Sequence, residues 1–192
     1  GVNETHDMAF LAGYHSKAGT PKGILCHTLL SLHVCNFRIN EEIVGEAAIN
    51  AAICGSYGVP VALVTGNSEL EIEAESTLPP GFTFCSTKTS IGFTAAICKT
   101  PKQSHAEIRA AAQLAVANFN QGKLSALRYQ GPVTMEVESY RREFTDNACV
   151  VHGVEKTGER SFSVTHDSAA KCFELIWRAM TYGMEETPWM LR

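Results

Sequence analysis

The feature that most constrains the fold is a strand, helix, strand pattern in the first third of the chain. Residues 8–14 and 59–65 are nearly unbroken apolar runs followed by turn residues, a pattern typical of buried β-strands. Between them, residues 44–57 place valine, alanine and cysteine at helical spacing and end near Gly55 and Gly58. This order predicts a βαβ crossover with at least partly parallel pairing of the two strands.

Shorter elements follow the crossover pattern. In the first half we predict a strand at 32–39 with a turn at Asn40 and Glu41, a polar helix at 69–78 and a strand at 82–87. Residues 101–119 form the clearest amphipathic helix, with Ser104 as its expected cap and Glu107 three residues on.

The pattern changes after residue 131, where short strand-like runs alternate with turn residues. We predict strands at 133–138, 148–154 and 161–165, and a final helix that Asp167 caps and that runs through Met180. The sequence therefore predicts an α/β fold. A domain at 1–122 should hold a mostly parallel sheet with flanking helices and the metal site, and 131–192 should form a smaller C-terminal α+β part.

Composition excludes two classes of partner. The net charge is −4 and the lysines and arginines are scattered, so the chain lacks the basic patch that nucleic acid requires. No apolar run approaches the roughly 18 residues of a membrane helix, and no signal peptide is visible. The seven cysteines include no close Cys-x-x-Cys pair, which favours reduced thiols. We expect a cytoplasmic protein with no nucleic-acid or membrane partner.

His15 and Glu46 are the candidate metal ligands. His15 follows the first apolar run, at the strand end where ligands collect in open α/β sheets, although a plain loop histidine fits the same position. Glu46 lies in the first turn of an almost uncharged helix, and it is either an ordinary helix-start residue or a buried carboxylate that requires a cation. Asn50, one turn later, could supply a donor. A histidine and a glutamate suit zinc, but the sequence offers no clear third ligand.

Two further residues are candidates for roles near such a metal. His27 could carry a proton, because imidazole exchanges protons near neutral pH. A Cys26–His27 nucleophile pair is disfavoured, because successive side chains of an extended segment face opposite ways. Lys88, beyond a later strand, could bind a carboxylate or polarise a carbonyl, and a surface lysine would look the same.

Six motifs in register resemble the zinc-dependent D-aminopeptidase family. They are Gly13-Tyr14-His15, Thr20-Pro21, His27, Val44-Gly45-Glu46 with Asn50, Val59-Pro60-Val61 with Gly66, and the segment from Lys88 to Pro101. The resemblance implies a homo-oligomeric metallo-aminopeptidase that hydrolyses N-terminal D-amino acids, such as D-Ala, from short peptides by zinc-activated water. It further implies two zinc ions per complete site and a ring-based decamer.

Matched by position, the resemblance assigns His15 and Glu46 as zinc ligands and His27 as the catalytic histidine. Asn50 and Lys88 remain candidate substrate contacts. The family's Asp-x-Glu-Gly and Asp-Ser-His motifs, which carry most of its metal ligands, do not occur here. The chain therefore resembles the later part of the family, without the N-terminal metal-binding segment.

Three explanations of this difference stay open: a fragment, a separate chain or segment that carries the missing strands, and a divergent protein with an incomplete zinc site. The alternative function is accordingly that of a non-catalytic scaffold or partner subunit of the same fold.

Overall fold

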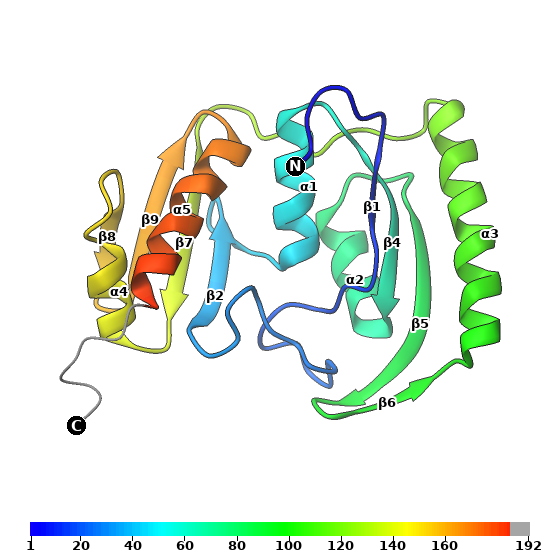
Figure 1. Ribbon diagram of the computed structural model, residues 1–192, viewed down its shortest axis with the longest axis horizontal. Coiled ribbons are helices and arrows are strands. Elements are labelled where there is room, and N and C mark those ends of the chain that lie inside the picture. The colour runs from blue at the N-terminus through cyan, green and yellow to red at the C-terminus, as the bar shows by residue number, and fades with distance from the viewer. Residues whose placement is uncertain (185–192) are drawn as a thin grey trace. The chain divides into compact units, whose positions relative to one another are not determined.

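The computed structural model describes residues 1–184, which form two compact units (Figure 1). The first unit consists of residues 1–27 and 44–128, and the second consists of residues 28–43 together with the described residues 129–184. The sequence predicted two continuous domains, at 1–122 and 131–192. The structure differs in segment 28–43, which belongs to the second unit because its strand pairs with a strand from the C-terminal half.

The first unit is built on a four-stranded sheet, in the order β1-β4-β5-β6. Its strands are β1 (Ala9–Leu11), β4 (Val61–Asn67), β5 (Thr83–Gly92) and β6 (Ala95–Cys98). β1 is parallel to β4 and β4 is parallel to β5, whereas β6 is antiparallel to β5. The predicted mostly parallel sheet is confirmed.

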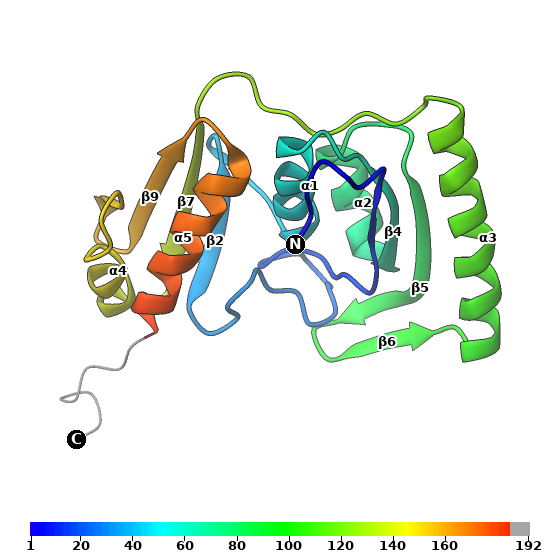
Figure 2. The ribbon, with the colours of Figure 1, turned by 45° about the horizontal axis from the view of Figure 1, so that its top comes forward.

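Helices cover both faces of this sheet. α1 (Glu46–Ser56) and α2 (Ser68–Thr77) lie on one face, and α3 (Pro101–Asn120) lies on the other (Figures 1 and 2). Ala47 of α1 and Leu70 of α2 pack in one core cluster with Val64 of β4. Ala115 of α3 packs with Leu63 on the opposite face. The order β1, α1, β4 is thus the crossover that the apolar runs predicted, with α1 buried against the sheet.

The junction between β4 and α2 is short because one residue serves both elements. β4 is buried along its whole length, as expected for a strand that begins with an apolar run and lies between two helical layers. Asn67 ends the strand, and its side chain accepts a hydrogen bond of 3.0 Å from the backbone N–H of Leu70. This capping bond starts α2 directly beyond the strand end.

The second unit contains a five-stranded antiparallel sheet, in the order β3-β2-β7-β9-β8. Its elements are β2 (Val34–Ile39), β3 (Glu42–Ile43), β7 (Val133–Ser139), α4 (Arg142–Ala148), β8 (Glu155–Gly158), β9 (Ser161–His166) and α5 (Ala169–Gly183). Burial alternates along β7, which leaves a core face and a polar face. Phe37, Met135, Phe162 and Ile176 are among its fully buried side chains.

The polar face of this sheet carries a charge cluster. Arg38 on β2 donates to Glu136 at 3.1 Å and to Glu138 at 3.0 Å, both on β7. Hydrogen bonds from Asn36 and then from Arg38 hold the pKa of the Glu138 carboxyl below its ordinary value, because they favour its charged form.

Three local predictions were wrong. Residues 148–154 are not a strand: α4 ends at Ala148 and turns follow, with Val150 70% exposed. The apolar residues Phe144 and Ala148 bury one face of α4, a helical spacing that the sequence reading missed. The cap of α3 is Thr100, which accepts a hydrogen bond from the Gln103 backbone, rather than Ser104. The N-cap of α5 is Ser168 rather than Asp167.

Within residues 1–184, no helix is both long enough and apolar enough to cross a membrane. All seven cysteines are free thiols in the structure, and Cys54, Cys85 and Cys172 are buried. Burial raises the pKa of the Cys172 thiol to about 11, so this group stays protonated at neutral pH.

Candidate metal centre

His15 lies just beyond the carboxyl end of β1, held beside the end of β4. The backbone N–H groups of Gly13 and Tyr14 both donate to the carbonyl oxygen of Thr65, at 3.1 and 2.9 Å. Gly13 has a φ of +80°, a conformation that suits glycine and turns the chain out of the strand. The strand-end position predicted for His15 is therefore observed.

Glu46 is the first residue of α1. Gly45 occupies the N-cap position and provides no side-chain hydrogen bond to the helix start. The backbone N–H groups of the first turn therefore favour a carboxylate at this place. The helix behind Glu46 buries Ala47, Ala48 and Ile49, so the carboxylate stands at the end of an apolar element, as the sequence predicted.

His27 is presented by a loop whose backbone is fixed in an unusual conformation. Lys22 and Leu25 both have positive φ, at 60° and 49°, which is uncommon outside glycine. Leu25 is anchored because its N–H donates to the carbonyl of Phe93 at 2.8 Å, in the turn between β5 and β6. The carbonyl of Leu25 in turn lies 2.7 Å from Nδ1 of His27. The loop thus holds the His27 ring through the backbone of a strained residue.

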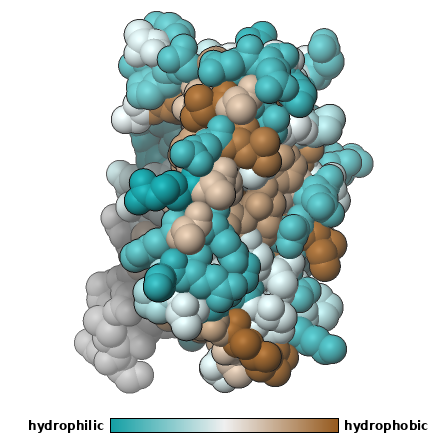
Figure 3. Space-filling view, turned by 90° about the vertical axis from the view of Figure 1, so that its right-hand side faces the viewer, coloured by the Kyte–Doolittle hydropathy of each residue, from teal (hydrophilic) through white to brown (hydrophobic). Residues whose placement is uncertain are grey.

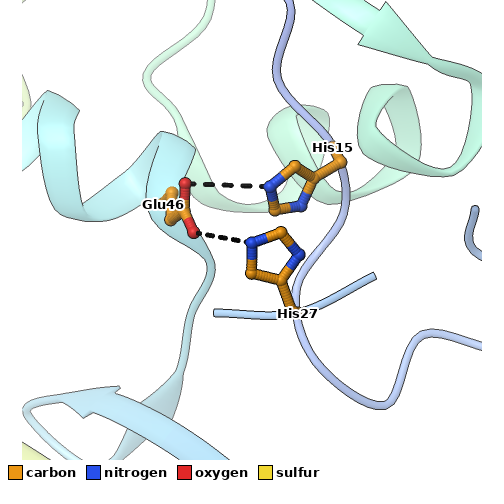
Figure 4. A group of neighbouring side chains, drawn as sticks. All are labelled: His15, His27 and Glu46. Atoms are coloured by element: carbon orange, nitrogen blue, oxygen red, sulfur yellow. Dashed lines mark ion pairs between the residues drawn. The ribbon is translucent and has the colours of Figure 1, made fainter. Parts of the chain in front are cut away.

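The three side chains converge (Figure 4). Nε2 of His15 lies 3.8 Å from one carboxylate oxygen of Glu46, and Nε2 of His27 lies 3.9 Å from the other. The two imidazole rings stack with their centroids 4.0 Å apart. All three side chains are partly buried, and all belong to the first structural unit. The structure thus brings together the residues that the sequence singled out at three separate positions.

The hydrogen bonds of the two histidines determine which ring nitrogen faces the carboxylate. Nδ1 of His15 lies 3.1 Å from the carbonyl oxygen of Ser16, and Nδ1 of His27 lies 2.7 Å from that of Leu25. A carbonyl oxygen only accepts, so Nδ1 carries the proton in each neutral ring. The lone pair is then on Nε2, the nitrogen that faces Glu46.

The group fits a zinc ion in donor type and in spacing. One atom each from His15, His27 and Glu46 lie within 4.8 Å of one another. Histidine–carboxylate separations of 3.8 and 3.9 Å are too long for hydrogen bonds. Ligands about 2.1 Å from a tetrahedral zinc lie roughly 3.4 Å apart, so a small contraction would place an ion among them. His27 thus places a third donor atom beside the two ligands that the sequence predicted, and its predicted role remains that of a proton carrier.

Tyr14 and Asn50 form a second polar pair near Glu46. The side-chain amide of Asn50 donates to the Tyr14 hydroxyl at 2.9 Å. Burial, followed by the negative charge of Glu46, raises the pKa of the Tyr14 phenol. One of the two amide protons of Asn50 is therefore used to fix Tyr14, a residue that the sequence reading did not select.

Glu73 is a buried carboxyl that the sequence reading also missed. It lies on α2, is 5% exposed, and accepts a hydrogen bond of 2.7 Å from the backbone N–H of Lys17. Burial raises the pKa of its carboxyl, and the Lys17 N–H opposes this effect. A signal was available: position 73 shares a helical face with the buried residues Leu70 and Ala74, where an apolar residue would be expected.

Lys88 lies on β5, where it is paired with Asn67 of β4 and Cys98 of β6. Its role as a substrate contact stays a prediction.

A groove of about 750 Å³ runs along α3, away from the predicted site residues, none of which lines it. Its lining residues are His105, Ile108, Arg109, Ala112, Gln113 and Val116. Figure 3 shows apolar side chains interrupting the hydrophilic surface on this side of the molecule.

Comparison with known proteins identifies similar sequences and structures. The chain matches the D-aminopeptidase family over residues 1–178. It is 36% identical over 104 residues to a D-aminopeptidase of Bacillus subtilis (strain 168), a match that spans 54% of this chain but 37% of the relative. It is also similar to a solved structure, described as the Zn-dependent D-aminopeptidase DppA from Bacillus subtilis, a self-compartmentalizing protease. That likeness has a TM-score of 0.86 and 27% identity, over 97% of this chain and 67% of the other.

Proposed function

Because this chain belongs to the D-aminopeptidase family, we propose that it carries part of the zinc site of an aminopeptidase acting on short peptides with an N-terminal D-amino acid such as D-Ala. The observation that supports this proposal is the convergence of the Nε2 atoms of His15 and His27 on the two carboxylate oxygens of Glu46, at 3.8 and 3.9 Å. Bound zinc would supply a Lewis acid that polarises the scissile carbonyl and promotes ionisation of water.

The residues of this chain would bind the metal, transfer protons and contact the substrate. His15 and Glu46 hold the metal through Nε2 and a carboxylate oxygen. His27 transfers a proton or stabilises charge at the reacting carbonyl, from a ring that the Leu25 carbonyl holds in place. Asn50 and Lys88 remain proposed substrate contacts. A second zinc ion is proposed on the family resemblance alone. Among residues 1–184, one group of candidate metal ligands is found, and it accounts for a single ion.

Metal content and kinetics of three variants test these roles. His15→Ala and Glu46→Ala should lose both stoichiometric zinc and hydrolysis of D-Ala peptides. His27→Ala should keep zinc and lose most of kcat; if it loses zinc instead, His27 is the third ligand rather than a proton carrier. Full activity in His27→Ala would contradict both roles. A matched L-Ala peptide tests the stereochemical preference.

The second candidate function is a scaffold subunit with an incomplete metal site. It is favoured by the sequence of this chain, in which the Asp-x-Glu-Gly and Asp-Ser-His motifs of the resembled family do not occur. Zinc analysis of the purified protein separates the two: zinc near stoichiometry supports an enzyme, and its lack supports a scaffold.

We further propose that the chain works in a homo-oligomer, such as a ring-based decamer, that includes a segment or separate chain with the remaining metal ligands. The relative described as a self-compartmentalizing protease supports an assembly. Native mass spectrometry of the protein purified from its own cells would give the number of copies and the mass of any additional chain. A monomer of this chain that hydrolyses D-Ala peptides at full rate would contradict the proposal. A cytoplasmic location is likewise proposed, and fractionation of the cells tests it.

A further inference from the structure

Two segments of the first unit contact one buried carboxyl group, that of Glu73 on α2. The first segment is the loop after β1, which carries His15 and then Lys17. The second is the start of α1, where Gly45 precedes Glu46. These two segments are far apart in the chain, yet both contact the same carboxyl through one oxygen each.

The contact with the His15 loop is a hydrogen bond. Oε2 of Glu73 accepts from the backbone N–H of Lys17 at 2.7 Å, two residues beyond His15. This bond is buried from water, and hydrogen bonds are electrostatically stronger inside a protein than in water. It therefore restrains the backbone that carries His15.

The contact with α1 is close packing against a glycine. A Cβ atom at position 45 would overlap Oε1 of Glu73, and it would also lie 2.9 Å from Cβ of Lys17. Gly45 has a φ of −102°, which any residue adopts, so the glycine is required for space and not for backbone conformation. The start of α1, and Glu46 with it, rests directly on the Glu73 carboxyl.

The placement of Glu73 is costly unless the group has a role. On α2 the carboxyl-bearing residue at position 73 is buried, while the neighbouring apolar Ile72 is 66% exposed. Oε1 of Glu73 has no hydrogen-bond partner, and a buried polar atom without a partner destabilises a protein. An apolar residue at this position would fit the helical face of Leu70 and Ala74 better.

We propose that Glu73 is a positioning residue for the metal centre, which sets the separation of His15 and Glu46 by holding the backbone on which each of them stands. Its observed contacts are with the backbone N–H of Lys17 and the start of α1, and it is not part of the candidate ligand group His15–His27–Glu46. The inference deepens the proposed zinc site and rests on it for its functional consequence. The geometric part concerns the protein without metal and is tested separately.

Zinc affinity, measured by competition with a chromophoric chelator, gives the first test. Glu73→Leu removes both oxygens, and its zinc affinity should fall about 10-fold to 100-fold, as for other residues that orient metal ligands. Glu73→Gln keeps an acceptor for Lys17 and should stay within about 3-fold of the wild type. Glu75→Leu, which alters an exposed glutamate of the same helix, is the matched control and should leave affinity unchanged.

Thermal stability separates positioning from a merely structural role. If Glu73 acts by positioning and its burial costs stability, Glu73→Leu should unfold at the same temperature as the wild type or higher. A structural role predicts lower stability with unchanged zinc affinity, and that result would overturn the inference. If Glu73→Leu does not fold, Gly45→Ala displaces the same carboxyl from the opposite side and should weaken zinc binding; unchanged affinity in Gly45→Ala would then refute the inference.

Nuclear magnetic resonance of the metal-free protein tests the geometry alone. The Lys17 amide should exchange slowly with solvent in the wild type and in Glu73→Gln, and rapidly in Glu73→Leu. Cross-relaxation between the rings of His15 and His27, whose centroids are 4.0 Å apart, should weaken in Glu73→Leu. If the wild type binds no zinc, the proposed function fails, and these two measurements still decide the inference: no change in either would overturn it.

Discussion

Replacing Gly66 by alanine should displace the segment that carries His15. Gly66 lies in β4, and a Cβ atom there would overlap the carbonyl oxygen of Tyr14 and lie 2.5 Å from Cδ2 of Leu70. Apolar carbon atoms normally approach to about 3.5–4.0 Å, so the methyl group would be roughly 1 Å too close. Backbone on one side and a fully buried leucine on the other leave it little room, so the Tyr14 backbone must move.

The expected loss of stability follows from these contacts. Overpacking of a dense interior costs about 1–3 kcal/mol. Movement of Tyr14 also weakens its 2.9 Å hydrogen bond to Thr65, and such a bond contributes about 1 kcal/mol. Together these effects predict a loss of about 2–4 kcal/mol, which lowers Tm by about 5–15 °C for a chain of this size. Zinc affinity should fall as well, because His15 follows Tyr14.

Circular dichroism during heating measures the first effect, and chelator competition measures the second. Gly92→Ala is the matched control: it also adds a methyl group to a glycine of the same sheet, at a place where the new atom meets nothing within 4 Å. Its Tm should stay within about 2 °C of the wild type, as for most surface changes. If Gly66→Ala unfolds at the same temperature as Gly92→Ala, β4 does not pack against the Tyr14 backbone as closely as the structure indicates.

Three further predictions concern the second unit and the thiols. Phe162→Ala should lower the free energy of unfolding by about 3–5 kcal/mol in denaturant titration, because Phe162 is fully buried in the core of the second unit; a loss below 1 kcal/mol would contradict this. In the native protein, iodoacetamide should label the exposed Cys98 and leave Cys172 unmodified at pH 8, since Cys172 is buried and its thiol pKa is raised to about 11; labelling of both at equal rates would refute the assignment. The lowered pKa of Glu138 stabilises the fold above the ordinary glutamate pKa, so stability should decline as the pH falls through the lower folded value. The decline should be smaller in Arg38→Gln, and an identical pH profile would exclude the ion pair as its cause.

Much of the first unit could be predicted from its sequence because local patterns specify it. The apolar run of β4 has the composition of a strand buried on both faces, and α1 has the composition of a buried helix. The position of Glu46 at a helix start and of His15 beyond a strand end followed from these elements alone. For parallel strands joined by a helix, this order is enough to bring the two residues to the same edge of the sheet.

The remaining features depend on contacts between distant parts of the chain. Segment 28–43 belongs to the second unit because β2 pairs with β7, about a hundred residues later, and periodicity carries no information about strand partners. His27 reaches Glu46 because Leu25 is anchored to the β5–β6 turn, which the loop sequence cannot reveal.

Glu73 shows most clearly which features the sequence determined and which depend on the tertiary structure. The sequence placed it on a polar helix, on the same face as Leu70 and Ala74, and the packing of α2 against the His15 loop and the start of α1 gives its carboxyl its contacts. Helical and strand periods are set by the local backbone, so the sequence by itself determined the elements and the candidate ligands. Their separations, and the carboxyl behind them, were decided by tertiary packing, because burial and hydrogen bonding between remote segments exist only in the folded chain.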